Sequence, residues 1–203
     1  MQPSAALSLV AAALLSAAQA ADEPFLGPLA PFEVSALSAP CGAGAASSDN
    51  VAFTVANPNR VTAGRSPHAE GGGYWSFENS TARCAGSCAE VSSPASSSSA
   101  LWSFRVSSTT TTNGTGAARE GFDVGFTLVY NVTRWGGVYY KVLEGTGRFV
   151  VGEQLVQRGG GGDDGDDDDG GSVGGAAGCE LVLADGAAPV LVPPTITDCK
   201  GTC

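Results

Sequence analysis

The sequence has little positive charge, a single histidine and no long apolar run after its first twenty residues. It carries 10 Lys and Arg against 20 Asp and Glu, which gives a formal net charge of −10 over 203 residues. Because nucleic-acid binding depends on clustered Lys and Arg, this composition argues against nucleic acid as a partner. No later run reaches the roughly 20 apolar residues of a membrane-spanning helix, and no lipid-anchor tail is recognised, so we expect no membrane insertion.

The presence of a single histidine argues against a zinc protease. A zinc-protease motif needs two histidines one helical turn apart, and only His68 is present. His68 lies near Ser66 and Glu70, but a Ser-His-acid triad requires convergence in space that sequence spacing does not show. We interpret His68 as an exposed loop residue.

Two glycine-rich matches to functional motifs lack the context that those motifs need. Residues 159–164 match one G-G-x-G-x-D calcium repeat, which works by stacking tandem copies. Residues 170–174 match G-x-S-x-G, but the strand and helix that flank a nucleophile elbow are missing. We therefore predict no metal site, no cofactor and no enzymatic activity. Paired carboxylates of the glycosidase type stay open, because nothing in the sequence selects two of its acidic residues.

The N-terminus predicts export. Residues 1–20 form a secretory signal peptide, with a weakly apolar segment over 5–18 and the small-x-small cleavage pattern Ala18-Gln19-Ala20. No Lys or Arg precedes the apolar segment. The mature chain, residues 21–203, is then one secreted, extracellular domain.

The cysteine count agrees with an extracellular location. An even number of cysteines in a secreted chain predicts disulfides, although six allow many pairings. The C-x3-C spacing occurs twice and fits either two local loops or cysteines bridged elsewhere, and the sequence leaves this open. A metal site is the weaker alternative. The six are Cys41, Cys84, Cys88, Cys179, Cys199 and Cys203.

The stretch 121–156 organises the predicted core. Over residues 122–132 apolar side chains occupy every second position, which predicts a strand with one buried face. We expect a bulge or bend near Gly125, a turn at 135–137, and strands over 138–143 and 148–151 separated at 144–147. Together these predict a three-stranded antiparallel meander. The alternating residues are Phe122, Val124, Phe126, Leu128, Tyr130 and Val132.

The remaining β-like segments place the chain in the all-β class, as a single antiparallel β-sandwich or β-barrel. Phe32 and Val34 share one face of the first strand. A turn is predicted at Asn57-Pro58-Asn59, where the asparagines hydrogen-bond locally, followed by a loop over 60–73. A helical turn is expected at 84–91. The other predicted strands cover 32–37, 51–55, 74–77, 101–106, 180–183 and 190–192.

Three low-complexity segments and three glycosylation sequons predict a solvated surface. The Ser/Thr tracts 92–99 and 107–112 are expected to stay in solvent. Residues 157–178, which hold six Asp between 163 and 169, predict a disordered, flexible acidic Gly/Asp loop. The N-glycosylation sequons begin at Asn79, Asn113 and Asn131. Asn113 is the best placed, in a predicted loop, and Asn131 points outward from its strand.

Several segments together resemble a known family. Phe32-Glu33-Val34, the run from Val51 to Asn59, Cys84, Trp102-Ser103-Phe104 and the later meander resemble small fungal secreted β-proteins related to the major allergen of Alternaria. The resemblance covers most of residues 32–156. It implies a compact disulfide-bonded β-barrel or sandwich without enzymatic activity, which acts where the fungus meets its host or its environment.

Three functions follow as hypotheses. The first is a non-catalytic secreted protein, effector-like or surface-associated, whose partner is a host or cell-wall glycan or protein. The second is a glycan-binding module whose aromatic side chains stack on sugar rings from one exposed face. The third is a secreted hydrolase. The aromatic candidates for the second are Tyr74, Trp75, Trp135, Tyr139 and Tyr140.

Overall fold

The computed structural model describes residues 28–42, 45–65, 74–92, 99–112, 118–134, 136–159, 179–201 and 203. This part of the chain is built from thirteen β-strands, and it contains no helix. The predicted signal peptide lies outside the described residues. The strands are β1 Phe32–Pro40, β2 Ala52–Asn57, β3 Val61–Arg65, β4 Tyr74–Phe77, β5 Ser80–Ala85, β6 Ser87–Ser92, β7 Ser99–Thr112, β8 Ala118–Arg134, β9 Gly137–Val150, β10 Leu155–Arg158, β11 Glu180–Leu183, β12 Val190–Val192 and β13 Thr195–Lys200.

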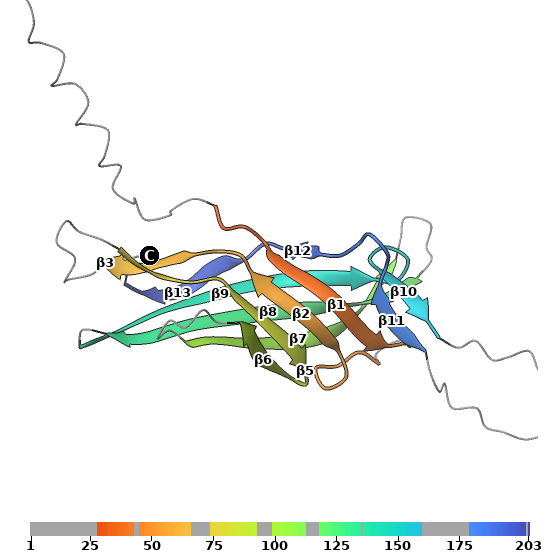
Figure 1. Cartoon of the computed structure of the whole chain (residues 1–203). Helices are drawn as coiled ribbons and strands as arrows, with labels where there is room; N and C mark the ends of the chain where they lie inside the picture. Colours follow the sequence, from red (N-terminus) through yellow and green to blue (C-terminus); the bar gives the residue numbers. More distant parts are fainter. Residues whose placement is uncertain are drawn as a thin grey trace, which may run out of the picture.

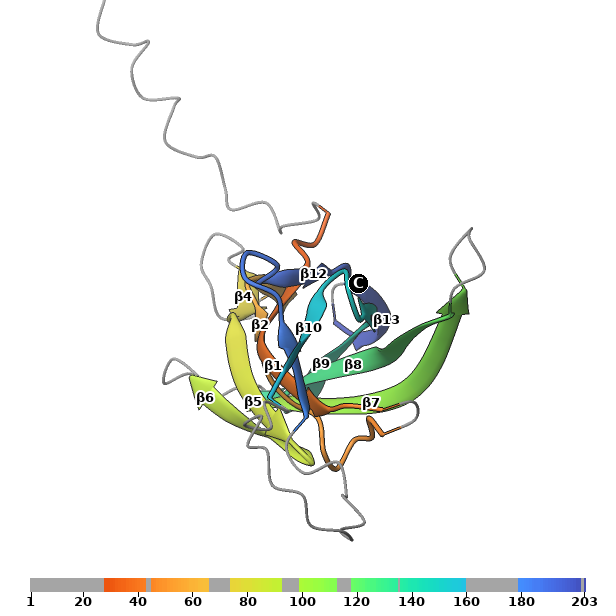
Figure 2. The same cartoon turned by 90° about the vertical axis from the view of Figure 1, so that its right-hand side faces the viewer.

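The strands form two main sheets and one separate hairpin (Figure 1). The first sheet has seven strands in the order β10-β11-β1-β2-β5-β6, with β12 also paired to β1. The second has four strands in the order β13-β9-β8-β7, and β3 pairs with β4. Seen along the strands, β1, β2 and β5 face β7, β8 and β9 across the core (Figure 2). Within the described chain no ladder closes the sheets into a barrel, so the predicted β-sandwich is the architecture.

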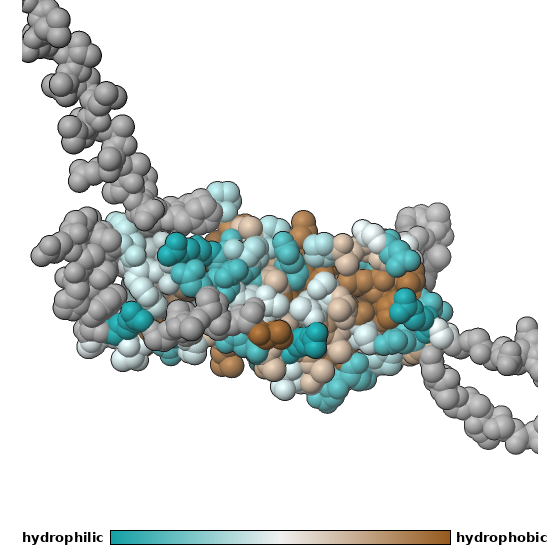
Figure 3. All heavy atoms as spheres, in the orientation of Figure 1, coloured by the Kyte–Doolittle hydropathy of each residue, from teal (hydrophilic) through white to brown (hydrophobic). Residues whose placement is uncertain are grey.

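Aromatic contacts between the two sheets fill the core. The Phe53 ring on β2 lies edge-on to Phe104 and Phe126, with centroids 4.8 and 5.4 Å apart. The Phe32 ring on β1 meets the Trp102 ring of β7 at 5.1 Å. Edge-to-face pairs of this kind add to the free energy of simple area burial. On the outside, Figure 3 shows hydrophilic and apolar side chains interspersed, with apolar ones gathered toward the β10–β11 end.

Strand β8 is the centre of the second sheet, and its alternation is confirmed. The even-numbered side chains from Phe122 to Val132 are buried, while the odd-numbered ones between them are partly or fully exposed. Each buried side chain is worth roughly 1.5–3 kcal/mol. No bulge forms near Gly125, where a bulge or bend was predicted, because β8 pairs without a register shift with both β7 and β9. Strands β7 and β9 have the same length, and each pairs with β8 residue by residue. The ladder therefore contains no extra residue.

The meander exists, but its strands differ from the predicted ones. It consists of β7, β8 and β9, and β9 continues through residues 144–147 where a break was predicted. The glycines there serve close packing instead of a turn. A Cβ on Gly147 would lie 2.7 Å from Val192 Cγ2, and one on Gly145 would lie 3.0 Å from the Pro193 carbonyl oxygen. Glycine lets β12 approach β9 at this point.

Two other local predictions are wrong for a shared reason. Residues 84–91 form the β5–β6 hairpin and no helical turn, with Gly86 at a φ of +69° in the connection. Val61–Arg65 is a strand and not part of a loop, because it pairs with β4. The Ser/Thr tract 107–112 also belongs to β7, paired with β8, and its residues Ser107 and Ser108 are exposed, as predicted. In each case pairing with a neighbouring strand outweighs a weak local preference.

A bulge in β1 decides which of its residues are buried. The register between β1 and β2 shifts between Ser35 and Ser38, where Ala36 has a φ of 52°. The extra residue reverses the alternation, so Leu37 points into the core on the same side as Phe32 and Val34. The alternation in the sequence predicted correctly that Phe32 and Val34 share one face. It did not indicate that the alternation reverses at Ala36.

The first sheet also anchors the ends of the Gly/Asp-rich segment. Strands β10 and β11 are antiparallel neighbours, and Arg158 lies opposite Glu180. The Cys41 amide donates a hydrogen bond of 3.3 Å to the Cys179 carbonyl, beside the disulfide between these cysteines. A flexible loop was predicted over residues 157–178, but Gln157 and Arg158 belong to β10 because they pair with β11, and residues 160–178 lie outside the described residues. The segment is therefore a connection between two paired strands.

Candidate functional site

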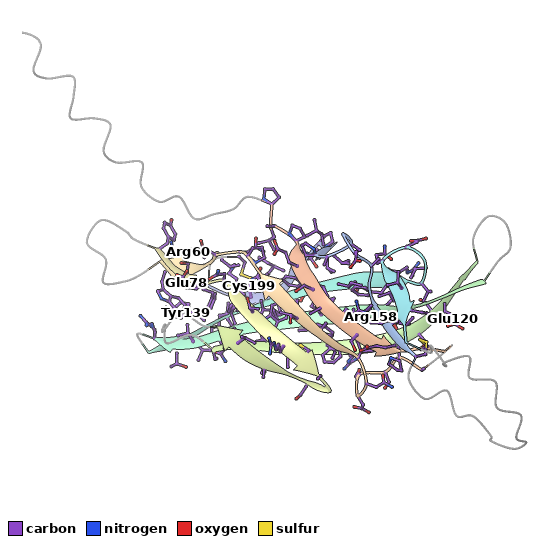
Figure 4. The ribbon with its side chains drawn as sticks, turned by 45° about the vertical axis from the view of Figure 1, so that its right-hand side comes forward. Arg60, Glu78, Glu120, Tyr139, Arg158 and Cys199 are labelled. Carbon is purple, nitrogen blue, oxygen red and sulfur yellow. A yellow bond between two sulfur atoms is a disulfide. The ribbon has the colours of Figure 1, made fainter. Side chains whose placement is uncertain are left out.

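Aromatic and polar side chains gather at one end of the sandwich, where β3, β4, the β8–β9 connection and β13 meet. We call this region the aromatic end. Figure 4 labels Arg60, Glu78, Tyr139 and Cys199 there, whereas Glu120 and Arg158 lie at the opposite end. The aromatic end comprises Asn57, Asn59, Arg60, Trp75, Phe77, Glu78, Tyr130, Arg134, Tyr139 and Lys141.

A stack of side chains runs from the interior of the aromatic end to its surface. The rings of Tyr130 and Phe77 are stacked, with centroids 5.0 Å apart and planes 15° apart. Phe77 meets the partly buried Trp75 edge-on at 4.9 Å. The Arg134 guanidinium carbon lies 5.3 Å from the centroid of the Trp75 ring. This distance is within the range of a cation–π contact, so Arg134 packs against the Trp75 ring.

Hydrogen bonds fix the inner end of the stack. Asn57 Nδ2 donates to the Tyr130 hydroxyl at 2.8 Å, and this hydroxyl donates to the Glu78 carbonyl at 2.9 Å. Burial raises the pKa of the Tyr130 phenol, because the charged phenolate would lose its solvation. The hydroxyl therefore stays protonated and ties three segments of the chain together.

The Asn57-Pro58-Asn59 turn forms as predicted, with local hydrogen bonds between its asparagines. The backbone amide and the Nδ2 of Asn59 both donate to Asn57 Oδ1, at 3.1 and 2.6 Å. Asn59 also holds Ala30, since its Nδ2 donates to the Ala30 carbonyl and its Oδ1 accepts from the Ala30 amide. These contacts make both buried asparagines structural.

Lys141 is the functional candidate that the sequence analysis missed. It is 3% exposed and occupies an inward position of β9, opposite Tyr130 on β8 and Cys199 on β13. Burial lowers the pKa of its amine, because the charged form loses solvation. The alternation of β9 could have identified this residue. An apolar residue such as Leu143 is expected to face inward, and Lys141, two positions earlier in the same strand, therefore faces inward as well.

The surface charges at this end compensate one another. Arg60 Nε lies 3.2 Å from Glu78 Oε1 and donates a hydrogen bond of 2.6 Å to Ser76 Oγ. The Arg60 side chain is largely exposed, so this ion pair stabilises the fold little.

The five aromatic candidates for glycan binding do not share one face. Tyr139 faces inward on β9, and Trp75 and Tyr139 both pack against the core. Tyr140 faces outward, with its hydroxyl 3.3 Å from both carboxylate oxygens of Asp198. The negative charge of Asp198 raises the pKa of the Tyr140 phenol. Trp135 lies outside the described residues.

All three disulfides are formed, and their pairing resolves the open alternatives. Cys41 bonds Cys179 across 138 residues of sequence. Both C-x3-C spacings are local loops, with Cys84 bonded to Cys88 and Cys199 bonded to Cys203. The described chain has no free cysteine, and it holds no group of three His, Cys, Asp or Glu side chains arranged for a metal ion.

The structure describes two of the three sequons. Asn79 is exposed in the connection between β4 and β5, and Asn131 is exposed on the outer face of β8, as predicted. Asn113 lies outside the described residues, as do His68 and the G-x-S-x-G match at 170–174. The single calcium-like repeat is described only at Gly159.

Comparison of the chain with family models, with curated proteins and with solved structures found no match. The resemblance to the Alternaria allergen family therefore stays a prediction that rests on the residues quoted for it. Among the residues described, no helix is long and apolar enough to span a membrane.

Proposed function

We propose that this chain is a secreted, non-catalytic protein, effector-like or surface-associated, that works outside the cell. The observation that carries the proposal is the Cys41–Cys179 disulfide, which joins β1 to the start of β11 across 138 residues. Bonds of this kind form and persist in oxidising compartments and are rare in the cytosol. Two local disulfides add to it, and the described cysteines are all paired.

The use of the buried polar groups supports a structural role over a catalytic one. Asn57, Asn59 and Tyr130 bind one another or the backbone. The Trp102 indole donates to Ser80 Oγ at 2.9 Å, which ties β7 to β5. A group that is already engaged in joining two sheets is poorly placed to bind or transform a substrate.

Export is tested by expressing residues 1–203 in a eukaryotic secreting host. We expect the protein in the medium, with Ala21 at its N-terminus and no titratable thiol. A chain that starts at Ala21 without the leader is the control and should stay inside the cell. Retention of the full chain in the cytosol with reduced cysteines would contradict the proposal.

Absence of catalysis is tested separately on the purified secreted protein. Glycosidase, esterase and protease substrates should show no turnover above a buffer blank. Turnover that disappears in His68→Ala would overturn the proposal and restore the hydrolase hypothesis.

Glycan binding is the second candidate, because Trp75 and Tyr139 lie at the same end of the sandwich as Arg134. Both rings are partly exposed, and the apolar face of an aromatic ring is a surface on which the C–H face of a sugar can pack. The measurement is retention of the protein on chitin, glucan and cellulose. If this candidate is right, Trp75→Ala releases the protein and Tyr140→Ala, on the outer face, does not. Lack of retention on every polymer would reject it.

A further inference from the structure

The outer face of the four-stranded sheet carries an apolar strip that no described segment covers. Leu101 on β7 lies opposite Val129 on β8, which lies opposite Val142 on β9. Leu101 is 64% exposed, and Val138 in the same face is 41% exposed. Val129, Tyr140 and Val142 lie between these two residues and are partly exposed. We define the outer strip as Leu101, Val129, Val138, Tyr140 and Val142.

A glycosylation sequon lies within this strip. Asn131 is exposed on the outer face of β8, directly opposite Tyr140 on β9 and Ser99 on β7. Thr133, the hydroxyl residue of the sequon, is two positions on and therefore faces the same way. It lies opposite Val138. The acceptor amide thus lies between Tyr140 and Ser99 across the sheet, and between Val129 and Thr133 along β8.

Tyr140 shares the outer face with Asn131, which lies opposite it on β8. Its hydroxyl lies 3.3 Å from each carboxylate oxygen of Asp198 on β13, on the side away from β8. Directly opposite residues in an antiparallel pair have Cβ atoms roughly 4.5–5.5 Å apart. A sugar attached to Asn131 would therefore start next to the Tyr140 ring and next to Val129 and Val142.

We propose that Asn131 carries an N-linked glycan whose first sugars lie on the outer strip and shield it from water. The inference rests on the proposed secretion, since the donor, a lipid-linked oligosaccharide pyrophosphate, is met in the secretory pathway. In the transfer, a C1–N bond forms between the sugar and Asn131 Nδ2. The C1–O bond to the pyrophosphate breaks, and the lipid pyrophosphate leaves with its electron pair. The amide nitrogen loses one proton to a base of the transferase.

The attached group fits this surface chemically. Sugar rings present C–H faces that bury apolar area and hydroxyls that stay in water, so a glycan covers apolar side chains and keeps the surface soluble. A flat association of two copies through the same face would be blocked by a glycan at its centre.

Site occupancy is measured on the chain secreted by a eukaryotic host. Trypsin releases the peptide 120–134, and amidase treatment should convert its glycosylated Asn131 to aspartate. We expect Asn131 to be converted in Thr133→Ser as well, because this variant keeps the sequon. The glycan should be lost in Thr133→Val and in Asn131→Gln. Failure of secretion would count against the proposed function, whereas a secreted protein with an unmodified peptide 120–134 would overturn this inference alone.

Shielding is measured by dye binding and by oligomeric state. Removal of the glycan, or Asn131→Gln, should raise the fluorescence of a hydrophobic dye by about twofold or more and promote self-association. Leu101→Ser combined with Asn131→Gln should reverse both effects. If deglycosylation changes neither the dye binding nor the oligomeric state, the glycan does not pack on the outer strip. A stable dimer of the glycosylated protein through this face would assign the strip to a second copy instead.

Discussion

Asn57 Nδ2 donates a hydrogen bond of 2.8 Å to the hydroxyl of Tyr130, although the two residues are 73 positions apart in the chain. Asn57 ends β2 of the seven-stranded sheet, and Tyr130 lies in β8 of the four-stranded sheet. The same hydroxyl donates to the Glu78 carbonyl in the β4–β5 connection. One phenol therefore joins two sheets and a turn at the aromatic end.

Tyr130→Phe should lower the free energy of unfolding by about 1–3 kcal/mol, because the buried Asn57 amide and the Glu78 carbonyl each lose a partner. Chemical denaturation at pH 7 measures the change. Tyr140→Phe removes an equivalent hydroxyl from the exposed face and is the matched control, with little expected effect. Equal stability of both variants would show that the hydrogen bond contributes nothing.

The three disulfides should contribute unequally to stability. Loop-closure entropy predicts about 5 kcal/mol for a bond that spans 138 residues and about 2 kcal/mol for one that spans four. Replacing Cys41 and Cys179 together by Ala should thus cost more than replacing Cys84 and Cys88. Thermal unfolding of the two double variants makes the comparison. The opposite order would contradict the entropic account, and non-reducing peptide mapping checks the pairing.

Lys141 should make the stability of the fold rise with pH. Its pKa is lowered in the folded state by desolvation, so between that value and the unfolded value near 10.4 the unfolded chain binds more protons. Below this window both states are charged, and the cost of burying the ammonium is fully present. The free energy of unfolding of the wild type, minus that of Lys141→Met, should increase as the pH is raised from 7 to 10.

Lys200→Met, at an exposed position of β13, is the matched control for Lys141. Urea titrations at several pH values give the free energies. A difference between wild type and Lys141→Met that stays constant with pH would show that the Lys141 amine keeps an ordinary pKa in the fold.

Ala36→Gly should stabilise the protein by about 1 kcal/mol, because Ala36 has a φ of 52°, which costs an L-residue energy that glycine avoids. Ala39→Gly, in a regular and buried part of β1, should do the opposite. Thermal melting of both variants provides the test. A loss of stability in Ala36→Gly would mean that the bulge does not hold this backbone conformation in solution.

Replacing residues 160–178 by a short Gly-Ser linker should preserve the fold. Its anchors are the Arg158–Glu180 pairing and the Cys41–Cys179 bond, and both are outside the replaced segment. A shorter loop lowers the entropic cost of closure by roughly 1 kcal/mol. Calorimetry should show an equal or higher melting temperature, and limited proteolysis of the wild type should cut within this segment. If the variant does not fold, residues 160–178 are required for folding.

The alternation of residues 122–132 was enough to predict the central strand and its buried face, because a strand with one face in the core has a period of two that the sequence displays directly. The same reasoning held for Phe32 and Val34, and turn chemistry identified Asn57-Pro58-Asn59. These features depend on neighbouring positions in the chain. They could be predicted without knowledge of any distant contact.

The tertiary structure alone decided the features that depend on distant segments. From the local sequence, Gly147 was predicted to lie between two strands, but it lies within β9, at the point that β12 approaches. Leu37 is buried because a bulge at Ala36 reverses the alternation, and Lys141 is buried because β8 and β13 lie on both sides of it. The cysteine pairs were equally beyond the sequence. Strand pairing joins residues far apart in the chain, so local patterns specify the strands, and packing specifies their partners.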